Sequence, residues 1–157
     1  MTDAWTSARR ILAVRLDAMG DVLMTAPALA ALANGPARPS ITLLTSPAGA
    51  AAAELLPSVD QTLVWRAPWM KHDAPGDAPD FSTMATLLRD LHFDAAVVFT
   101  VHSQSALPAA LLLHEAGIPL RAAHCRENPY RLLTHWLPEP EPHHFVRHEV
   151  RRQLDLV

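Results

Sequence analysis

Short apolar runs alternate along the chain with segments that carry apolar residues at helical spacing. Runs of this length are typical of strands buried on both faces, and an i, i+3, i+4 pattern predicts helices. The predicted strands are 11–16, 41–45, 62–65, 95–99 and 119–124. The predicted helices are 21–33, 47–56, 81–91 and 105–116, the last ending at Gly117, which suits the left-handed turn after a helix. This alternation predicts an α/β fold, a Rossmann-like parallel sheet with helices on both faces.

Two segments interrupt the alternation. Residues 66–80 (RAPWMKHDAPGDAPD) predict a long polar loop, and loops of this length are typically functional or disordered. The run PEPEP at 138–142 predicts a stiff linker, because proline lacks the donor that a helix or a central strand needs. Helical spacing returns over 143–157. We therefore expect one domain over 1–137, followed by a linker and terminal helix over 138–157.

Composition narrows the functional classes. The 157 residues suffice for one domain with a real core, and half of them are hydrophobic. Thirteen basic and sixteen acidic residues give a net charge of −3, which argues against a nucleic-acid partner. The single cysteine, Cys125, excludes an internal disulfide and fits a reducing compartment. No apolar run approaches the roughly 20 residues of a membrane-spanning helix, and the first residues do not resemble a signal peptide. We expect a soluble cytoplasmic protein.

The stretch RLDAMGDVLMTAPAL, residues 15–29, follows the first predicted strand. In an open parallel sheet, ligands bind where such a loop leaves the carboxyl end of a strand. Gly20 favours a tight turn and close approach of a ligand. Asp21 is either a helix cap or a general base that deprotonates a substrate hydroxyl. Thr25 can cap a second helical start at Pro27. The stretch is neither a GxGxxG dinucleotide pattern nor a Walker motif.

This stretch resembles the N-terminal signature of the family 9 glycosyltransferases, the lipopolysaccharide heptosyltransferases. The shared features are a basic residue after the strand (Arg15), the pair Gly20-Asp21, and the run TAPAL at 25–29. Weaker similarity continues through 93–98, Gln104, 116–121 and 126–127, so the resemblance covers most of the chain.

The resemblance implies the N-terminal, acceptor-side half of a GT-B fold, with 1–137 as the Rossmann-like acceptor-side domain. It implies that Asp21 is the catalytic base of an inverting transfer from a nucleotide sugar, ADP-heptose, to a lipopolysaccharide-core acceptor. It implies that the reaction needs no cofactor and no metal. It also implies that the enzyme works at the inner face of the cytoplasmic membrane, where it can make peripheral contact with the membrane. The C-terminal nucleotide-sugar domain would be absent from this chain, so we expect the chain alone to show little transfer.

Several side chains are candidates for substrate contact. Lys71 and Arg66 can meet phosphates or acidic sugars, and Trp65 and Trp69 can stack on sugar rings, unless Trp65 simply ends a strand in the core. Arg15 can pair with Asp21 or with an acidic acceptor, and Asp17 is a polar contact or a turn residue. The candidate substrate-binding residues are Arg15, Asp17, Met19, Gly20, Lys71 and Gln104.

The sequence departs from the family pattern after the fourth strand. The family often has Asp-x-Gln-Gly there, whereas this chain has His102 and Ser105 in place of the aspartate and the glycine. We therefore expect acceptor recognition by this loop to differ from the usual pattern.

Three further clusters have both a functional and a structural interpretation. His144 and His148 are four residues apart, but without a third ligand a solvated helix face is favoured over a metal site. His124-Cys125 favours a strand end with a buried thiol over a nucleophilic pair. The arginines of the last helix form a basic stripe, typical of a solvated face or of contact with the absent domain or anionic headgroups; they are Arg147, Arg151 and Arg152.

A second function from another class stays open. A non-catalytic Rossmann-like binding module for a phosphorylated or glycosylated ligand has the same fold and the same cleft. A second α/β half with a nucleotide site downstream of Val157 would favour the enzyme.

Overall fold

A computed structural model describes residues 3–71, 76–140, 144 and 146–157. The strands are β1 (Arg10–Arg15), β2 (Ser40–Thr45), β3 (Gln61–Val64), β4 (Ala95–Val98), β5 (Leu120–Cys125) and β6 (His135–Pro138). The helices are α1 (Asp3–Thr6), α2 (Met19–Met24), α3 (Ala26–Ala33), α4 (Pro47–Ala53), α5 (Phe81–Asp90), α6 (Leu107–Glu115) and α7 (Glu149–Leu154). Every strand pairs in parallel, in the order β3-β2-β1-β4-β5-β6. The predicted Rossmann-like parallel sheet is confirmed.

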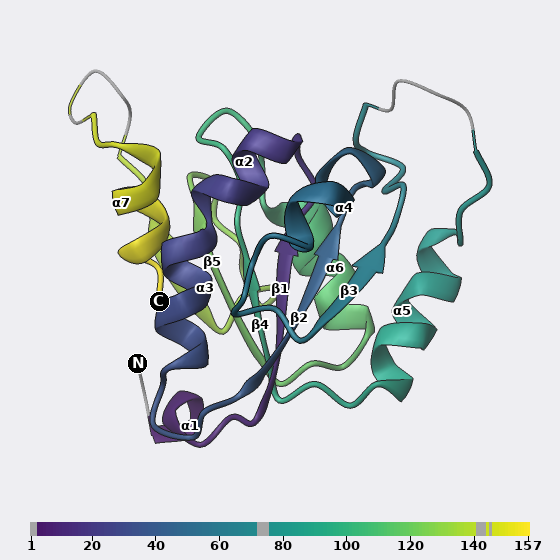
Figure 1. Ribbon diagram of the computed structural model, residues 1–157, viewed down its shortest axis with the longest axis horizontal. Coiled ribbons are helices and arrows are strands. Elements are labelled where there is room, and N and C mark those ends of the chain that lie inside the picture. Colours follow the sequence, from purple (N-terminus) through teal and green to yellow (C-terminus); the bar gives the residue numbers. More distant parts are fainter. Residues whose placement is uncertain (1–2, 72–75, 141–143, 145) are drawn as a thin grey trace.

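Helices cover both faces of the sheet, as predicted (Figure 1). Successive side chains of a strand point to opposite faces, so β1 contributes to two cores. Ile11 and Ala13 pack on the side that holds α2, α3 and α4. Leu12 and Val14 pack on the other side, against α5 and α6. Arg15 follows Ile11 and Ala13 in this alternation, which places its side chain on the α2 side.

The five predicted strands are confirmed to within one or two residues. The helix predicted over 21–33 is two helices, α2 and α3, that meet at Thr25 as the sequence indicated. Thr25 does not cap α3 through its side chain, however, because its hydroxyl donates to the Val22 carbonyl at 2.5 Å. Gly117 has a φ of +72°, so its predicted left-handed turn is confirmed.

Strand β6 was not predicted. It has four residues, and its last residue, Pro138, belongs to the segment interpreted as a linker. Proline is compatible with this place because β6 is at the edge of the sheet. The Trp136 indole secures the strand by donating to the Cys125 carbonyl at 2.8 Å. The rest of the predicted linker lies partly outside the described residues, at 141–142.

Helix α7 is shorter than the helical spacing over 143–157 indicated, and residues 143 and 145 lie outside the described part. It packs beside α3 and α2 on the same face of the sheet (Figure 1). Leu156, which follows the helix, is buried in the core on this face, and Gln153 is completely buried. The boundary expected at 137/138 stays a prediction. None of the helices in the described ranges is both long and apolar enough to cross a bilayer.

Candidate active site

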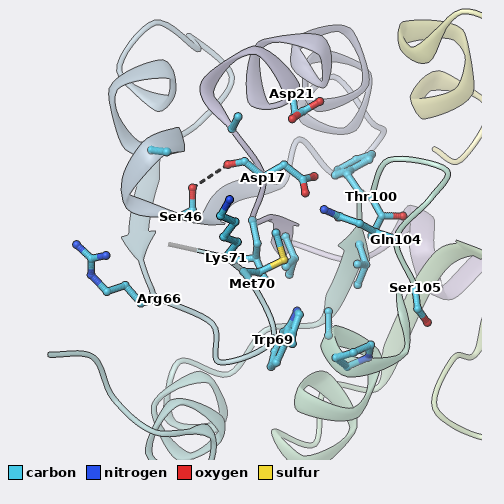
Figure 2. Close-up of a pocket in the computed structure, with 18 of the residues that line it drawn as sticks. Asp17, Asp21, Ser46, Arg66, Trp69, Met70, Lys71, Thr100, Gln104 and Ser105 are labelled. Atoms are coloured by element: carbon cyan, nitrogen blue, oxygen red, sulfur yellow. Dashed lines mark hydrogen bonds between the residues drawn. The ribbon is translucent and has the colours of Figure 1, made fainter. Parts of the chain in front are cut away.

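The strand order places a crevice between the loops that follow β1 and β4. The chain winds outward from β1 in one direction through β2 and β3, and in the other through β4, β5 and β6. Loops at such a switch point diverge and leave space at the carboxyl ends of the strands. A cleft of about 660 Å³ lies there. Its polar and aromatic lining includes Asp17, Asp21, Ser46, Arg66, Trp69, Lys71, Thr100, Gln104 and Ser105 (Figure 2).

Asp21 is the third residue of α2 and lines the cleft. Its side chain is 33% exposed, so the carboxylate can meet a ligand. The helix-cap interpretation is wrong: Ala18 occupies the N-cap position, and no side chain caps this helix. A carboxylate in the first turn is nevertheless stabilised by the helix dipole.

Arg15 is the last residue of β1 and is completely buried. Its Nη2 lies 3.3 Å from Oδ1 of Asp21, and its Nε lies 2.8 Å from Oδ2 of Asp17. Its Nη1 lies 3.3 Å from Oε1 of Glu149 in α7. Of the two interpretations that the sequence left open, the structure supports the pairing with Asp21. Arg15 thus holds the carboxylates in place from beneath the cleft.

Asp17 lies in the loop between β1 and α2 and is almost completely buried at the cleft wall. Burial raises the pKa of Asp17, and this effect outweighs the lowering by Arg15 and by the side chain of Gln104. The nearby charges of Asp21 and Glu149 raise the pKa further. Figure 2 shows the Gln104 amide pointing toward this carboxylate. Asp17 and Gln104 therefore bring hydrogen-bonding groups together in the cleft from two different loops, those after β1 and after β4.

Ser46 also lines the cleft, which was not predicted from the sequence. Its hydroxyl donates to the main-chain carbonyl of Asp17 at 2.7 Å and accepts from the Gly49 amide at 3.0 Å. It thus caps α4 and ties the loops after β1 and β2 together. The sequence did contain a sign of this cap, because serine followed by proline, here Pro47, is typical of the N-cap and first position of a helix.

The loop after β4 supplies the opposite wall. Thr100, Gln104 and Ser105 line the cleft. The Ser105 hydroxyl accepts from the Leu107 amide at 3.2 Å, at the start of α6. His102 does not line the cleft and lies near Glu139, with Nδ1 3.6 Å from Oε1.

The loop after β3 brings aromatic and basic side chains to the cleft. Trp65 is buried in the core, so the core interpretation is confirmed for it. Trp69 packs edge-on against Trp65 at 5.2 Å between ring centroids and lines the cleft. Arg66 also lines the cleft, and the Lys71 side chain points into it (Figure 2). Residues 72–75 of the predicted loop lie outside the described residues.

Two candidate residues lie near the cleft without lining it. Met19 is 46% exposed at the start of α2. A Cβ on Gly20 would meet nothing within 4 Å, so the space for close approach is there. The predicted tight turn at Gly20 is wrong, because the residue is helical and its φ is not positive.

The basic stripe predicted on the last helix is wrong for Arg147, which precedes α7, and for Arg152. The Arg152 side chain is buried, pairs with both Glu139 oxygens and donates to the Thr100 carbonyl. Burial alone would raise the pKa of Glu139, but Arg152 lowers it overall through hydrogen bonding and charge. Arg147 and Arg151 both pair with Asp155.

The helix face expected for His144 and His148 is wrong, because α7 begins at Glu149 and both histidines precede it. Burial raises the pKa of the Cys125 thiol to about 11, which supports the buried-thiol interpretation against a nucleophile. His148 caps α7, since its Nδ1 accepts from the Val150 amide at 3.3 Å. Within the described ranges, no three histidine, cysteine, aspartate or glutamate side chains gather as metal ligands.

Three solved structures share this fold. ADP-heptose LPS heptosyltransferase II of E. coli aligns at a TM-score of 0.68 and 19% identity, over 94% of this chain and 39% of that chain. A family 9 glycosyl transferase from Veillonella parvula aligns at 0.68 and 17% identity, over 99% of this chain and 41% of that chain. E. coli heptosyltransferase WaaC with ADP-2-deoxy-2-fluoro heptose aligns at 0.65 and 17% identity, over 93% of this chain and 46% of that chain.

The likeness confirms the predicted fold, the Rossmann-like architecture found in GT-B heptosyltransferases. The chain spans less than half the length of each of the three structures. No protein-family model matches the chain, and no curated protein matches it by sequence.

Proposed function

We propose that this chain is the acceptor-binding domain of an inverting glycosyltransferase, with Asp21 as the catalytic base. The enzyme transfers heptose or a related sugar from a nucleotide sugar, ADP-heptose, to a lipopolysaccharide-type acceptor. The observation that carries the proposal is the place of Asp21: a partly exposed carboxylate, held by Arg15, on the wall of a cleft at the carboxyl end of the sheet.

The proposed reaction is a direct displacement. The Asp21 carboxylate takes the proton from an acceptor hydroxyl as that oxygen bonds to the anomeric carbon of the donor. The bond from this carbon to the diphosphate oxygen breaks at the same time, and ADP leaves with the electron pair. Attack from the side opposite the leaving group inverts the anomeric configuration. The proton on Asp21 then returns to solvent, and the step uses no cofactor and no metal.

The remaining cleft residues suit an acceptor that is both sugar-like and anionic. Lys71 and Arg66 provide positive charge for phosphate or carboxylate groups. Trp69 offers a ring edge and face to a sugar, and Asp17 and Gln104 offer hydrogen-bonding groups to its hydroxyls. Open space around Gly20 admits the acceptor close to the start of α2. In this proposal the nucleotide is held by a second, C-terminal domain, and the enzyme works at the inner face of the cytoplasmic membrane.

The test is transfer by the full-length protein with ADP-heptose and a lipopolysaccharide-core acceptor. Asp21→Asn keeps the shape of the side chain but removes the base, so kcat should fall at least about 100-fold. Acceptor binding should persist, because the other contacts remain. Asp90→Asn is the matched control, since Asp90 is exposed at the end of α5.

Two results would contradict the proposal. Undiminished transfer by Asp21→Asn would remove Asp21 from the chemistry. Acceptor binding by a wild-type protein that transfers none of a panel of nucleotide sugars would favour the non-catalytic binding module.

A further inference from the structure

Helix α7 contacts both walls of the cleft from behind. On one side, Oε1 of Glu149 lies 3.3 Å from Nη1 of Arg15, which in turn holds Asp21. On the other side, the Thr100 carbonyl accepts from Nη1 of Arg152 and from Nε2 of Gln153, the latter at 3.1 Å. Thr100 belongs to the loop after β4 that lines the cleft. The two walls are therefore joined through one turn of α7.

From these contacts we propose that Glu149 is a positioning residue, which acts on the Asp21 carboxylate through the buried guanidinium of Arg15. The effect of Glu149 on catalysis rests on the proposed function, whereas the coupling between Glu149 and Asp21 through Arg15 does not.

Glu149 is itself held firmly. Its Oε1 accepts from Nε2 of Gln153 and lies 3.4 Å from Nη1 of Arg152, in addition to its contact with Arg15. Three donors on one carboxylate oxygen restrict the side chain to one orientation. Glu149 is therefore a fixed anchor for the guanidinium.

Arg15 transmits this constraint because each of its three nitrogens faces a different carboxylate. Nε faces Asp17, Nη2 faces Asp21 and Nη1 faces Glu149. The guanidinium is planar and rigid, and here it is completely buried. Loss of the partner of Nη1 leaves a buried cation unbalanced, and the group then turns toward the remaining carboxylates. Reorientation of this kind displaces Asp21, and small displacements of a reacting group are costly in rate.

The charge of Glu149 also affects the pKa of Asp17, which can be measured without an activity assay. Burial is the main cause of the raised pKa of Asp17. The charges of Asp21 and Glu149 raise this pKa further, whereas the charge of Arg15 and the hydrogen bond of Gln104 lower it. Replacing Glu149 with glutamine removes this charge and keeps the size of the side chain. The pKa of Asp17 should then fall.

The experiment compares Glu149→Gln with Glu149→Asp and with Arg151→Gln. Arg151 is on the same helix with a side chain 73% exposed, so it controls for loosening of α7. Carboxyl carbon NMR over a pH series follows Asp17, assigned with Asp17→Asn, and circular dichroism confirms the fold. In the full-length protein, kcat and the acceptor KM are measured for each variant.

We expect Glu149→Gln to lower the titration midpoint of Asp17, and Arg151→Gln to leave it unchanged. In full-length protein, kcat should fall about tenfold in Glu149→Gln while the acceptor KM stays within about twofold. Glu149→Asp keeps the charge and should restore part of the rate. If Glu149→Gln does not fold, kcat of Glu149→Asp is the test: it should fall, because the shorter side chain cannot keep its contact with Arg15, whereas kcat of Arg151→Gln should not fall.

An unchanged Asp17 midpoint in Glu149→Gln would overturn the proposal whatever the activity. An equal loss of kcat in Arg151→Gln would also overturn it, because docking of α7 alone would then explain the effect. A shifted midpoint in a protein that shows no transfer would support the coupling and contradict the proposed function, so the two failures are distinguishable.

Discussion

Arg15 and Asp21 form an ion pair that joins the interior of the protein to its cleft, with 3.3 Å between Nη2 and Oδ1. Arg15 is completely buried, whereas the Asp21 side chain is one third exposed. A buried cation needs opposite charges close to it, because burial removes the stabilisation that water gives. The pairing therefore explains both why an arginine can end a buried strand and why the Asp21 carboxylate has a defined place at the cleft.

Replacement of Arg15 should destabilise the protein strongly. Arg15→Met leaves the carboxylates of Asp17, Asp21 and Glu149 without their common partner, and breaking a buried pair in this way costs about 3–5 kcal/mol of unfolding free energy. Arg15→Lys keeps the charge but cannot address three carboxylates in one plane, so its loss should be intermediate. Urea unfolding followed by circular dichroism measures both. If Arg15→Met lowers the unfolding free energy no more than Arg131→Met, a replacement of an exposed arginine, the ion pairs of Arg15 contribute little.

Replacement of two glycines near the cleft by alanine should have opposite effects on the free energy of unfolding. A Cβ on Gly49 would lie 2.2 Å from Oγ1 of Thr45 and 2.8 Å from Cγ2 of Val22, so α4 could not keep its close contact with α2. Gly49→Ala should therefore lower the unfolding free energy by about 1–3 kcal/mol. Gly20→Ala should be neutral or stabilising by up to about 1 kcal/mol, because its Cβ meets open space within a helix.

Thermal unfolding of the two variants tests this pair of expectations. The same Gly20→Ala variant also tests the substrate contact proposed at this position. If the acceptor approaches the start of α2 closely, the added methyl group should raise the acceptor KM of the full-length protein without loss of stability. An unchanged KM would remove Gly20 from the binding residues.

His124 should make the protein less stable in mild acid. Burial lowers the pKa of His124, whose Nε2 donates to the Arg152 carbonyl at 2.9 Å. The unfolded chain therefore binds the proton more readily than the folded one. The stabilisation is complete above the ordinary pKa of 6.5 and is lost as the pH falls from there through the pKa in the folded protein.

Urea unfolding at about pH 7.5 and about pH 5.5 measures this loss. It should be smaller in His124→Gln, which does not titrate, than in the wild type. His114→Gln is the matched control, since His114 is exposed on α6, and it should lose as much stability as the wild type. Equal losses in all three proteins would contradict the assignment to His124.

The local features of the fold could be predicted from the sequence because they depend on nearby residues. Apolar runs such as 95–99 indicated buried strands, and the meeting of two helices at Thr25 followed from Pro27. Strand β6 could not be predicted in this way, since it is short, lies at the sheet edge and ends in proline. Its pairing with β5 is a property of the sheet and not of its own residues.

The same distinction applies to the site. The position of Asp21 after the first strand followed from the sequence, because the carboxyl end of a strand in an open parallel sheet leads into a crevice. The partners of Arg15 did not follow from it. Glu149 lies 134 residues further along the chain, and its approach to Arg15 depends on the packing of α7 beside α2 and α3. Likewise, helical spacing suggested that Arg152 is solvated, whereas it is buried against Glu139.

The sequence by itself thus determined the alternation of strands and helices, the parallel sheet and the carboxylate at its carboxyl edge. Hydrophobic periodicity and turn chemistry act over a few residues, so they can be read locally. Only the tertiary structure decided which charged groups meet around that carboxylate, because burial and ion pairing depend on segments that the fold brings together from distant parts of the chain.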